Sequence, residues 1–452
     1  MSAQLIGEPE WQIAAFAADF RWEDIPAFVQ HQAKRSIFNI FATSFSGCQE
    51  PAITKALAVM SPFSAAGDVS LIGRSERRDA GLAAFVNAMA ANIFDYDDNH
   101  PTTIIHPTAP VSPALFAFAE ANPRSGVELL RAFVIGAEIE CRIGKAMSPY
   151  HYAHGWHITS TCGIFGASIG VGALLGLNAA QFNWAMANAA VQAAGLVEAL
   201  GTMSKSISVG NAARQGMMSA LLAAQDFSGP PAPLTGERGY LNVCCDAPKL
   251  DELTKGLGDV WEIGKNTYKP YPAGVVLNPV IDASLEIASL PGFDPGAVAT
   301  VTLTGHPLLR QRTDRADVAT GRESQVSAQH AIAAAFLRNK VGLDEFNDSA
   351  VAETMRSGRP DVTFIDDASY DIAAARMSVR MKDGATHEIN IAAARGAPAN
   401  PLSDGDLEKK LAMLSKWARY PRDIGPLVEG LWRLDEATDA GAVSRLAAVA
   451  ES

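Results

Sequence analysis

The chain has 452 residues and a formal net charge of −12, with 48% hydrophobic and 19% charged residues. This length and hydrophobic share favour a globular protein of two or three domains. The acidic balance, with no block of Lys and Arg, disfavours a nucleic-acid-binding protein or a membrane-surface protein. The first twenty residues have no basic segment followed by an apolar one, so we expect no secretory signal and a cytoplasmic protein. The five cysteines form no CxxC pair, which indicates buried thiols and no metal site.

Residues 8 to about 228 have the periodicity of successive helices. Apolar residues at three- and four-residue steps form one helical stripe, at Leu82, Phe85, Val86, Met89, Ala90 and Ile93. Ser125 with Glu128, and Asn178 with Gln181, have the form of capping boxes at helix starts. This part of the chain is therefore predicted to be all-helical.

Three glycines fall on one face of the most apolar predicted helix, at Gly163, Gly166 and Gly170. Small residues on one face let a neighbouring helix approach closely, which is a packing role. They form no GxGxxG motif and follow no strand, so the sequence excludes a dinucleotide site here.

The pattern changes near residue 265. Residues 299–304 alternate between apolar residues and Thr, which is typical of a half-buried strand, and residues 377–391 resemble a hairpin around Asp383-Gly384. A helix is predicted between them, over about 327–337, and helical periodicity returns after Leu407. We therefore expect a mostly α protein with an α+β part. A large all-helical domain comes from both chain ends, residues 1–268 and 396–452, and a smaller α+β domain of residues 269–395 is inserted.

The first candidate functional segment contains Asp95, Asp97 and Asp98 and runs on to His106. The three acids follow a predicted helix, and a helix C-terminus disfavours negative charge. Function is one explanation for this unfavourable placement. The other is that the acids cap a neighbouring helix or pair with basic residues.

Two further segments carry groups that transfer protons or bind anions. His157 directly precedes the Gly-rich helix, where free backbone N–H groups attract anions. Lys205 is predicted in a short polar loop between two apolar helices, and an enclosed ammonium there would need an anionic partner such as a substrate carboxylate. An exposed lysine and a surface histidine are the alternatives.

The last two segments lie at the predicted domain junction and in the inserted domain. Lys269 begins Lys-Pro-Tyr-Pro at the junction, and junctions are frequent places for ligand clefts. Asn278-Pro279 resembles a helix cap with the first helical residue, which gives Asn278 a structural reading. His330 begins the predicted helix of the inserted domain and is a weak signal alone.

Together these segments resemble the MmgE/PrpD family, in the same order and over nearly the whole chain. The family's D-F-D-D-T-H-like segment followed by H-P is similar to residues 95–107. Its G-[FW]-H before a Gly-rich helix is similar to residues 155–157, and its G-x-x-x-K followed by G-x-A-A to residues 201–213. A K-P-[YF]-P-like segment, with a following helix that carries I-D-A, is similar to residues 269–283.

The resemblance implies a helical domain and an α+β domain with an active-site cleft between them, usually in a homodimer. It implies chemistry at the carbon beside a carboxylate of a small polycarboxylic acid, without metal or organic cofactor. Family activities include 2-methylcitrate dehydration, cis-aconitate decarboxylation and iminodisuccinate epimerisation.

The resemblance also implies roles for individual residues. Lys205 and Lys269 would bind substrate carboxylates and stabilise the enolate charge. His106 and His157 are candidates for base and acid, in an order that the sequence leaves open, and Asp95 would orient one histidine.

Three positions depart from the family pattern or extend it. Asn99, which stands where Thr is frequent, is expected to bind the substrate beside the two lysines. His330 stands where Tyr or His is frequent and is a candidate proton donor. Asn278 stands where many members have His, so one titratable group is missing.

The leading hypothesis is a hydro-lyase similar to 2-methylcitrate dehydratase. The runner-up is a dicarboxylate epimerase or isomerase, which the missing acid group favours slightly because epimerisation expels no leaving group. A decarboxylase is third. A non-catalytic carboxylate-binding homologue is the alternative of another class, and the retained lysines and histidines argue against it.

Overall fold

A computed structural model describes residues 8–450 and divides the chain into two compact units. The larger unit comprises Met1–Ile93, Asp97–Asn266 and Ser403–Ser452, and the smaller comprises Phe94–Tyr96 and Thr267–Leu402. The predicted boundaries lay after residues 268 and 395, and residues 94–96 were predicted in the larger unit.

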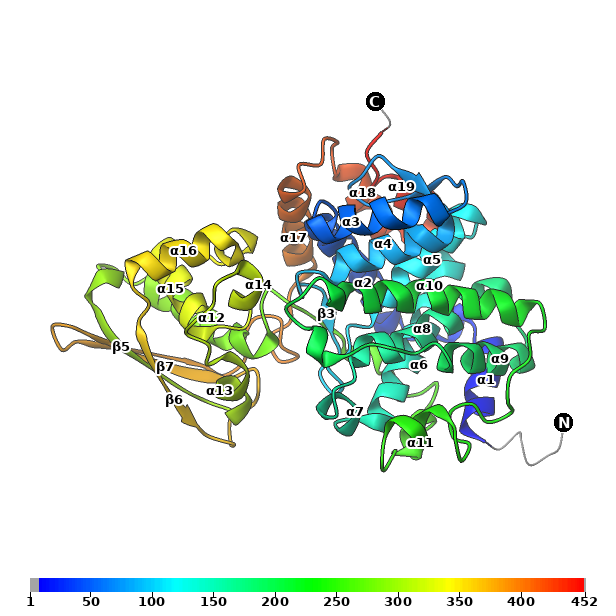
Figure 1. Cartoon of the computed structure of the whole chain (residues 1–452), viewed down its shortest axis with the longest axis horizontal. Helices are drawn as coiled ribbons and strands as arrows, with labels where there is room; N and C mark the ends of the chain where they lie inside the picture. Colours follow the sequence, from blue (N-terminus) through cyan, green and yellow to red (C-terminus); the bar gives the residue numbers. More distant parts are fainter. Residues whose placement is uncertain (1–7, 451–452) are drawn as a thin grey trace. The chain divides into compact units, whose positions relative to one another are not determined.

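The larger unit is built from helices that both ends of the chain supply (Figure 1). Its helices are α1 Pro9–Asp19, α2 Ala27–Gly47, α3 Pro51–Met60, α4 Ala80–Asn92, α5 Thr108–Ala121, α6 Gly126–Met147, α7 Tyr150–Ala153, α8 Ile158–Leu175, α9 Ala179–Ala190, α10 Ser204–Ala224, α11 Tyr240–Cys244, α17 Asp404–Trp417, α18 Gly425–Trp432 and α19 Ala440–Arg445. Its short strands are β1 Val69–Ser70, β2 Arg77–Arg78 and β3 Asp98–Asn99, of which β1 and β2 pair antiparallel.

Helix α8 is the central helix of this unit and packs against α5, α6, α9 and α10. The glycine prediction is confirmed, because a Cβ at Gly166 or Gly170 would meet the backbone or side chains of α5 and α6. Helix α8 is apolar and long enough to cross a membrane, but 89% of it is buried within the unit, as in the core helix of a globular protein.

The predicted helix starts are confirmed in the larger unit. Ser125 begins α6 with a capping box completed by Glu128, and Asn178 begins α9 in the same way with Gln181. Each pairing satisfies two backbone N–H groups that a helix start otherwise leaves without partners. The five cysteines are buried and form no disulfide, as expected.

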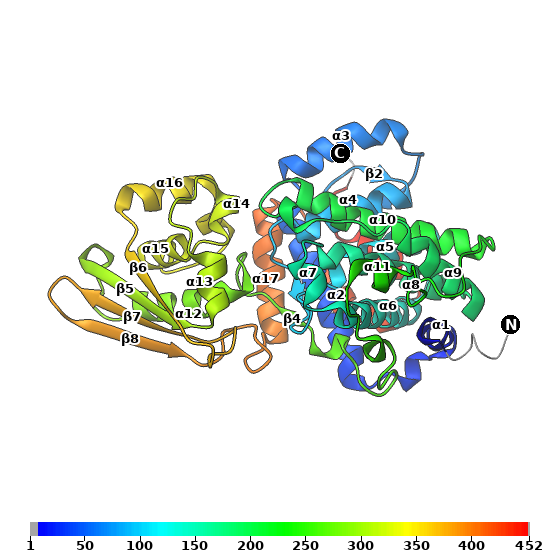
Figure 2. The same ribbon diagram turned by 60° about the horizontal axis from the view of Figure 1, so that its bottom comes forward.

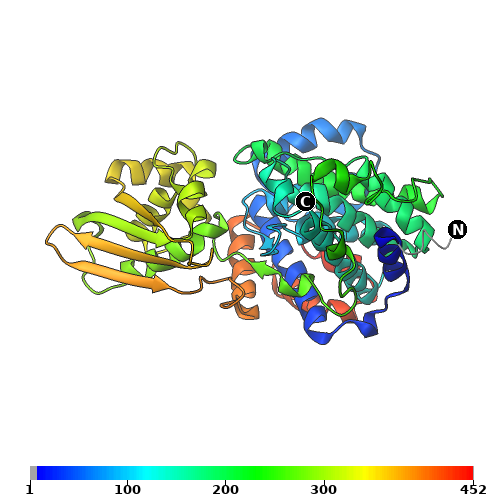
Figure 3. The ribbon, with the colours of Figure 1, turned by 90° about the horizontal axis from the view of Figure 1, so that it is seen from below.

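The smaller unit has a four-stranded mixed sheet covered on one face by helices (Figure 2, Figure 3). The strand order is β6-β5-β7-β8, with β5 parallel to β6 and antiparallel to β7, and β7 antiparallel to β8. The elements are β4 Thr267–Tyr268, α12 Asn278–Ala288, β5 Val298–Gly305, α13 Pro307–Thr313, α14 Gly321–Ser324, α15 Ala328–Arg338, α16 Asp348–Ser357, β6 Asp361–Asp366, β7 Ala375–Met381 and β8 Thr386–Ile391.

The core of the smaller unit lies between this sheet and two helices. Every second residue of β7 is buried, from Ala375 to Met381, and packs with α12 and α15. The predicted strand β5 and the predicted β7–β8 hairpin are confirmed, and the alternation of burial in β7 shows that one face of this strand is covered. The helix expected at 327–337 is α15.

Candidate functional site

The acidic segment after α4 is divided between the two units. The helix ends at Asn92, and Asp95 adopts a left-handed backbone with φ of 53°, a conformation in which Asp is enriched among non-glycine residues. Asp95 belongs to the smaller unit, whereas Asp97 and Asp98 belong to the larger. The three acids therefore have different partners and are treated separately.

Asp98 caps a neighbouring helix, which confirms the structural alternative for this residue. Its Oδ2 accepts hydrogen bonds from the Thr108 backbone N (3.1 Å) and hydroxyl at the start of α5, and from Asn266 Nδ2 (2.6 Å). A helix N-terminus favours negative charge, in contrast to the C-terminus that precedes this segment. Complete burial, and next the charge of Asp97, raise the pKa of Asp98 to about 6.

Asp97 forms a carboxylate–histidine pair with His106. The Oδ1 of Asp97 lies 3.0 Å from Nδ1 of His106, and its Oδ2 accepts a hydrogen bond from Asn92 Nδ2 at 2.7 Å. Asp97 is fully buried and His106 is 8% exposed. Asp97 is therefore the acid whose carboxylate contacts Nδ1 within the larger unit, and the orienting role expected of Asp95 stays a prediction.

The contacts of His106 determine which ring nitrogen carries the proton. Its Nδ1 lies 3.0 Å from a carboxylate oxygen of Asp97 and 2.6 Å from the carbonyl oxygen of Asp98. Both partners only accept hydrogen bonds, so Nδ1 must be the donor. In the neutral ring Nε2 is then the basic nitrogen, and proton exchange with a ligand would use Nε2.

His157 has the same tautomer for a different reason. It is the residue before α8, as predicted, and its Nδ1 lies 3.2 Å from Ser160 Oγ and 3.3 Å from Ser208 Oγ. Each serine hydroxyl already donates to a backbone carbonyl, of His157 (2.9 Å) and Lys205 (2.8 Å) respectively. The hydroxyl oxygens can therefore only accept from Nδ1, which again makes Nε2 the basic atom.

Lys205 lies in the first turn of α10, so its predicted placement in a loop was wrong. Of the two alternatives left open by the sequence, enclosed or exposed, the structure shows the enclosed one, because the residue is only 6% exposed. Its Nζ has a long contact of 3.5 Å to the carbonyl oxygen of Asn92. A buried ammonium needs acceptors, and the carbonyl oxygen of Asn92 is one of them.

A chain of contacts relates the two histidines and the lysine in the larger unit. Two of its five links end on backbone carbonyls, those of Lys205 and Asn92, so it is not one hydrogen-bonded relay. The order of residues along it is His157, Ser208, Lys205, Asn92, Asp97 and His106.

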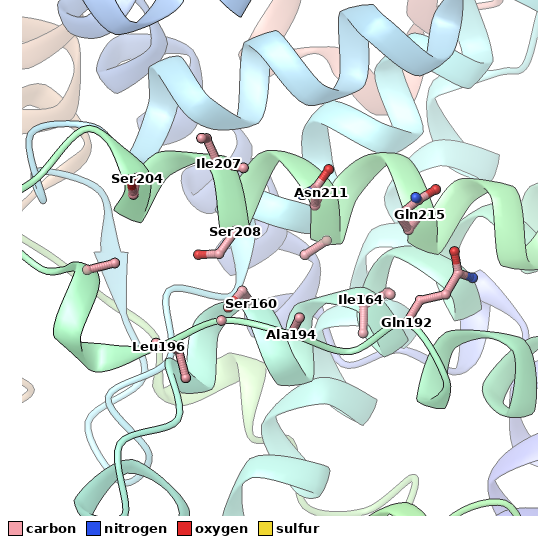
Figure 4. Close-up of a pocket in the computed structure, with 13 residues that line it drawn as sticks. Ser160, Ile164, Gln192, Ala194, Leu196, Ser204, Ile207, Ser208, Asn211 and Gln215 are labelled. Atoms are coloured by element: carbon pink, nitrogen blue, oxygen red, sulfur yellow. The ribbon is translucent and has the colours of Figure 1, made fainter.

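A pocket of about 500 Å³ lies beside His157, between α8 and α10. Ser160 and Ser208, the two partners of His157, face each other across it (Figure 4). Its lining residues, all of them described by the structure, are amides, hydroxyls and apolar side chains without a charge. This pocket therefore suits an uncharged group and does not itself supply a carboxylate-binding cation.

The smaller unit places Lys269 beside Asp95. The Lys269 Nζ lies 2.8 Å from Oδ2 of Asp95 and donates to its backbone carbonyl at 3.0 Å. Lys269 is 4% exposed. Residues 94–96 are held there by Tyr96 Oη, which donates to Pro270 O at 2.9 Å, and by Gln325 Nε2, which donates to Phe94 O at 2.8 Å.

Asn278 and Asn99 occupy well-defined positions without a demonstrated role. Asn278 is the first residue of α12 and not its cap, because the helix begins one residue earlier than predicted. Its buried Oδ1 has no hydrogen-bond partner among residues 8–450. Asn99 lies in β3 and is 6% exposed. Its substrate-binding role stays a prediction.

His330 has structural partners at both ring nitrogens. Its Nε2 donates to Glu345 O at 2.7 Å, and its Nδ1 lies 3.0 Å from Thr354 Oγ1. Burial lowers the pKa of His330 to about 4, so the ring is neutral at physiological pH. These contacts favour a packing role in the smaller unit over the expected role as proton donor, which stays untested.

The comparisons with known proteins cover nearly the whole chain. Residues 11–253 match the MmgE/PrpD N-terminal domain, and residues 271–421 match the MmgE/PrpD C-terminal domain. The cis-aconitate decarboxylase of Mus musculus is 25% identical over 92% of this chain and 88% of its own length, and that of Homo sapiens is 26% identical over 92% and 90%. The cis-aconitate decarboxylase of Aspergillus terreus is 29% identical over 60% of this chain and 58% of its own length.

The two domain matches together span both units of the fold and all the residues of the chain of contacts. The chain therefore belongs to the MmgE/PrpD family, whose enzymes act on small carboxylic acids.

Proposed function

We propose that this protein is a cofactor-independent lyase that transfers a proton at the carbon beside a carboxylate of a small polycarboxylic acid. The observation that supports this most is the pair of buried histidines, His106 and His157, each with Nδ1 as donor and Nε2 as basic atom. A basic ring nitrogen can take a proton from carbon, and the imidazolium so formed can return one.

Decarboxylation of the cis-aconitate type is the first reaction to test, because the named relatives are cis-aconitate decarboxylases. In that reaction the bond between a carbon and one carboxylate breaks, and CO₂ leaves without the electron pair. The pair remains as a carbanion that a neighbouring carboxylate delocalises, and a proton from an imidazolium then binds to carbon. From the sequence alone, dehydration was the leading hypothesis and decarboxylation was the third.

Lys205 and Lys269 are proposed to bind the carboxylates of the substrate. An ammonium close to a carboxylate stabilises the additional negative charge that develops in the transition state. Both lysines are almost completely buried, so the attraction is less screened by water than at a surface.

The test is proton NMR of the purified protein in D₂O with cis-aconitate, 2-methylcitrate, citrate and iminodisuccinate. We expect new vinyl signals and CO₂ from cis-aconitate, with deuterium in the product. Vinyl signals from a hydroxy acid would support the dehydratase instead, and loss of an α-proton signal without a new compound would support the epimerase. No change with any of these acids would contradict the proposal.

We also propose a homodimer and a cytoplasmic location. The exposed face of α10 carries Ile207, Met218 and Leu222 at helical spacing, and Leu196 and Met203 precede the helix with exposed side chains. Several exposed apolar side chains on one surface support a protein contact.

A further inference from the structure

Glu140 is a buried acid that the proposed mechanism does not use. It lies in the middle of α6, is 0% exposed, and neither carboxylate oxygen has a hydrogen-bond partner among the described residues. The missing side chain of Gly166 on α8 makes the space for it, because a Cβ there would overlap with Oε2 of Glu140. An ionised carboxylate without any donor is among the most costly groups to bury.

Glu138, two residues earlier on the same helix, is a buried glutamate whose two carboxylate oxygens both have hydrogen-bond donors. Its Oε1 accepts from Arg142 Nε at 2.7 Å, and its Oε2 accepts from the backbone N of Ile263 at 3.0 Å. Glu140 has neither kind of partner. The two glutamates therefore differ in protonation: Glu138 is ionised, and Glu140 is neutral.

Asp98 and Glu140 both lie beside the first turn of α5. Asp98 accepts from the backbone N of Thr108 there, and a Cβ at Gly163 would lie 2.3 Å from Cγ of Pro110 and 3.6 Å from Oε2 of Glu140. Burial, and next the charge of Asp98, raise the pKa of Glu140 well above its usual range. The other titratable neighbours are the thiols of Cys141 on α6 and Cys162 on α8, whose pKa values burial also raises. None of these groups supplies a positive charge to Glu140.

Two interacting buried carboxyl groups do not both ionise readily, and the hydrogen bonds determine which one does. Oδ2 of Asp98 receives three hydrogen bonds and caps α5, whereas Glu140 receives none. Asp98 is therefore the anion and Glu140 the neutral acid. Oδ1 of Asp98 is buried and also has no partner among the described residues, so it can accept the proton of Glu140.

We propose that Glu140 is a positioning residue, a neutral acid that donates its proton to Asp98, directly or through one enclosed water, and thereby holds the Asp97–Asp98 segment around His106. The link to His106 is short, because the carbonyl of Asp98 accepts from its Nδ1 at 2.6 Å and the carboxylate of Asp97 lies 3.0 Å from the same atom. Only the effect on turnover rests on the proposed function.

The first test compares wild type with Glu140→Gln by urea unfolding at several pH values above about 4.5. A neutral Glu140 means that the wild type takes up a proton on folding in this range, so its folding constant falls as pH rises. The amide of the variant takes up none. We expect the ratio of the folding constants, variant to wild type, to rise about tenfold per pH unit. A ratio independent of pH would overturn the proposal.

The second test uses Glu140→Leu, which cannot donate a hydrogen bond, with Glu138→Gln as the matched control. We expect Glu140→Leu to shift the ring-nitrogen NMR signals of His106 and to lower kcat at least tenfold with little change in KM. Glu140→Gln should keep the His106 signals and kcat close to those of the wild type, because its amide still donates a hydrogen bond. Glu138→Gln should lower stability without shifting the His106 signals.

Unchanged His106 signals in Glu140→Leu would overturn the proposal, as would an equal shift in Glu140→Gln. The unfolding and NMR measurements need no substrate. An enzyme inactive on every acid tested would therefore contradict the proposed function and leave the role of Glu140 to be decided by those two results. If Glu140→Leu does not fold, the pH dependence of the ratio of folding constants, Glu140→Gln to wild type, decides whether the proposal stands.

Discussion

Buried histidines in this protein differ in how their ring nitrogens are used. Both nitrogens of His330 contact neighbours in the smaller unit, and both nitrogens of His100 do so in the larger, with Thr103 and Glu262. In His106 and His157 the contacts described above use Nδ1. Residue type alone does not separate these cases, because the sequence contains the ring and not its partners.

The structural role of His330 predicts a specific acid sensitivity. Its pKa is about 4 in the folded protein, against about 6.5 when unfolded, so between these pH values only the unfolded chain binds the proton. The free energy of unfolding should therefore fall by about 3 kcal/mol as pH decreases from about 6.5 to about 4. Urea unfolding should show a weaker pH dependence for His330→Gln, and equal slopes would contradict this assignment.

The sequence pointed to the acidic segment but not to the partner of each of its three acids. Asp95, Asp97 and Asp98 have the same residue type and lie after the same helix, so nothing local distinguishes them. Their partners come from distant parts of the chain: Lys269 for Asp95, His106 for Asp97, and Asn266 with Thr108 for Asp98. The left-handed backbone at Asp95 separates the first acid from the other two.

Helices α8 and α10 approach closely at Gly216. A Cβ at this position would lie 2.5 Å from Ala167 Cβ and 2.7 Å from the carbonyl oxygen of Ile164. We expect Gly216→Ala to lower the free energy of unfolding by about 1–3 kcal/mol, because the backbone of α8 must move. Gly405→Ala on α17 is the control, since its nearest neighbour lies at 3.9 Å, and thermal denaturation should show it unchanged or slightly more stable. Equal stability of both variants would contradict the close packing.

Elements with strong local signals were predicted well. The capping boxes at Ser125 and Asn178 and the strands β5 and β7 were predicted from short-range spacing, and all are found in the structure, with a clear alternation of burial in β7. Lys205 was placed in a loop because polar residues surround it. The structure puts it in the first turn of α10, where polar residues are also common.

The oligomeric state is the first prediction for the whole molecule. If the exposed apolar face of α10 forms a homodimer, a charge at its centre should separate the two chains. Light scattering of Met218→Glu should give the mass of one chain, whereas Met413→Glu, at an equally exposed methionine on α17, should keep the mass of two. A monomeric wild type, or a dimeric Met218→Glu, would contradict this interface.

The family and the division into helical and α+β parts were predicted from motif order and periodicity, which need no knowledge of contacts between distant residues. The reaction was not determined in this way, because it depends on how a few donors surround one substrate. The central claim to test is therefore that His106 transfers a proton while Asp97 holds its ring.

The most direct test compares the turnover of cis-aconitate by wild type, Asp97→Asn and Asp95→Asn. An asparagine at position 97 can no longer hold the His106 ring with a carboxylate, so we predict that kcat falls about 10²- to 10⁴-fold with little change in KM. Asp95→Asn should change kcat less than tenfold, since the carboxylate of Asp95 pairs with Lys269 at 2.8 Å. A large loss of kcat in Asp95→Asn, with an active Asp97→Asn, would contradict it.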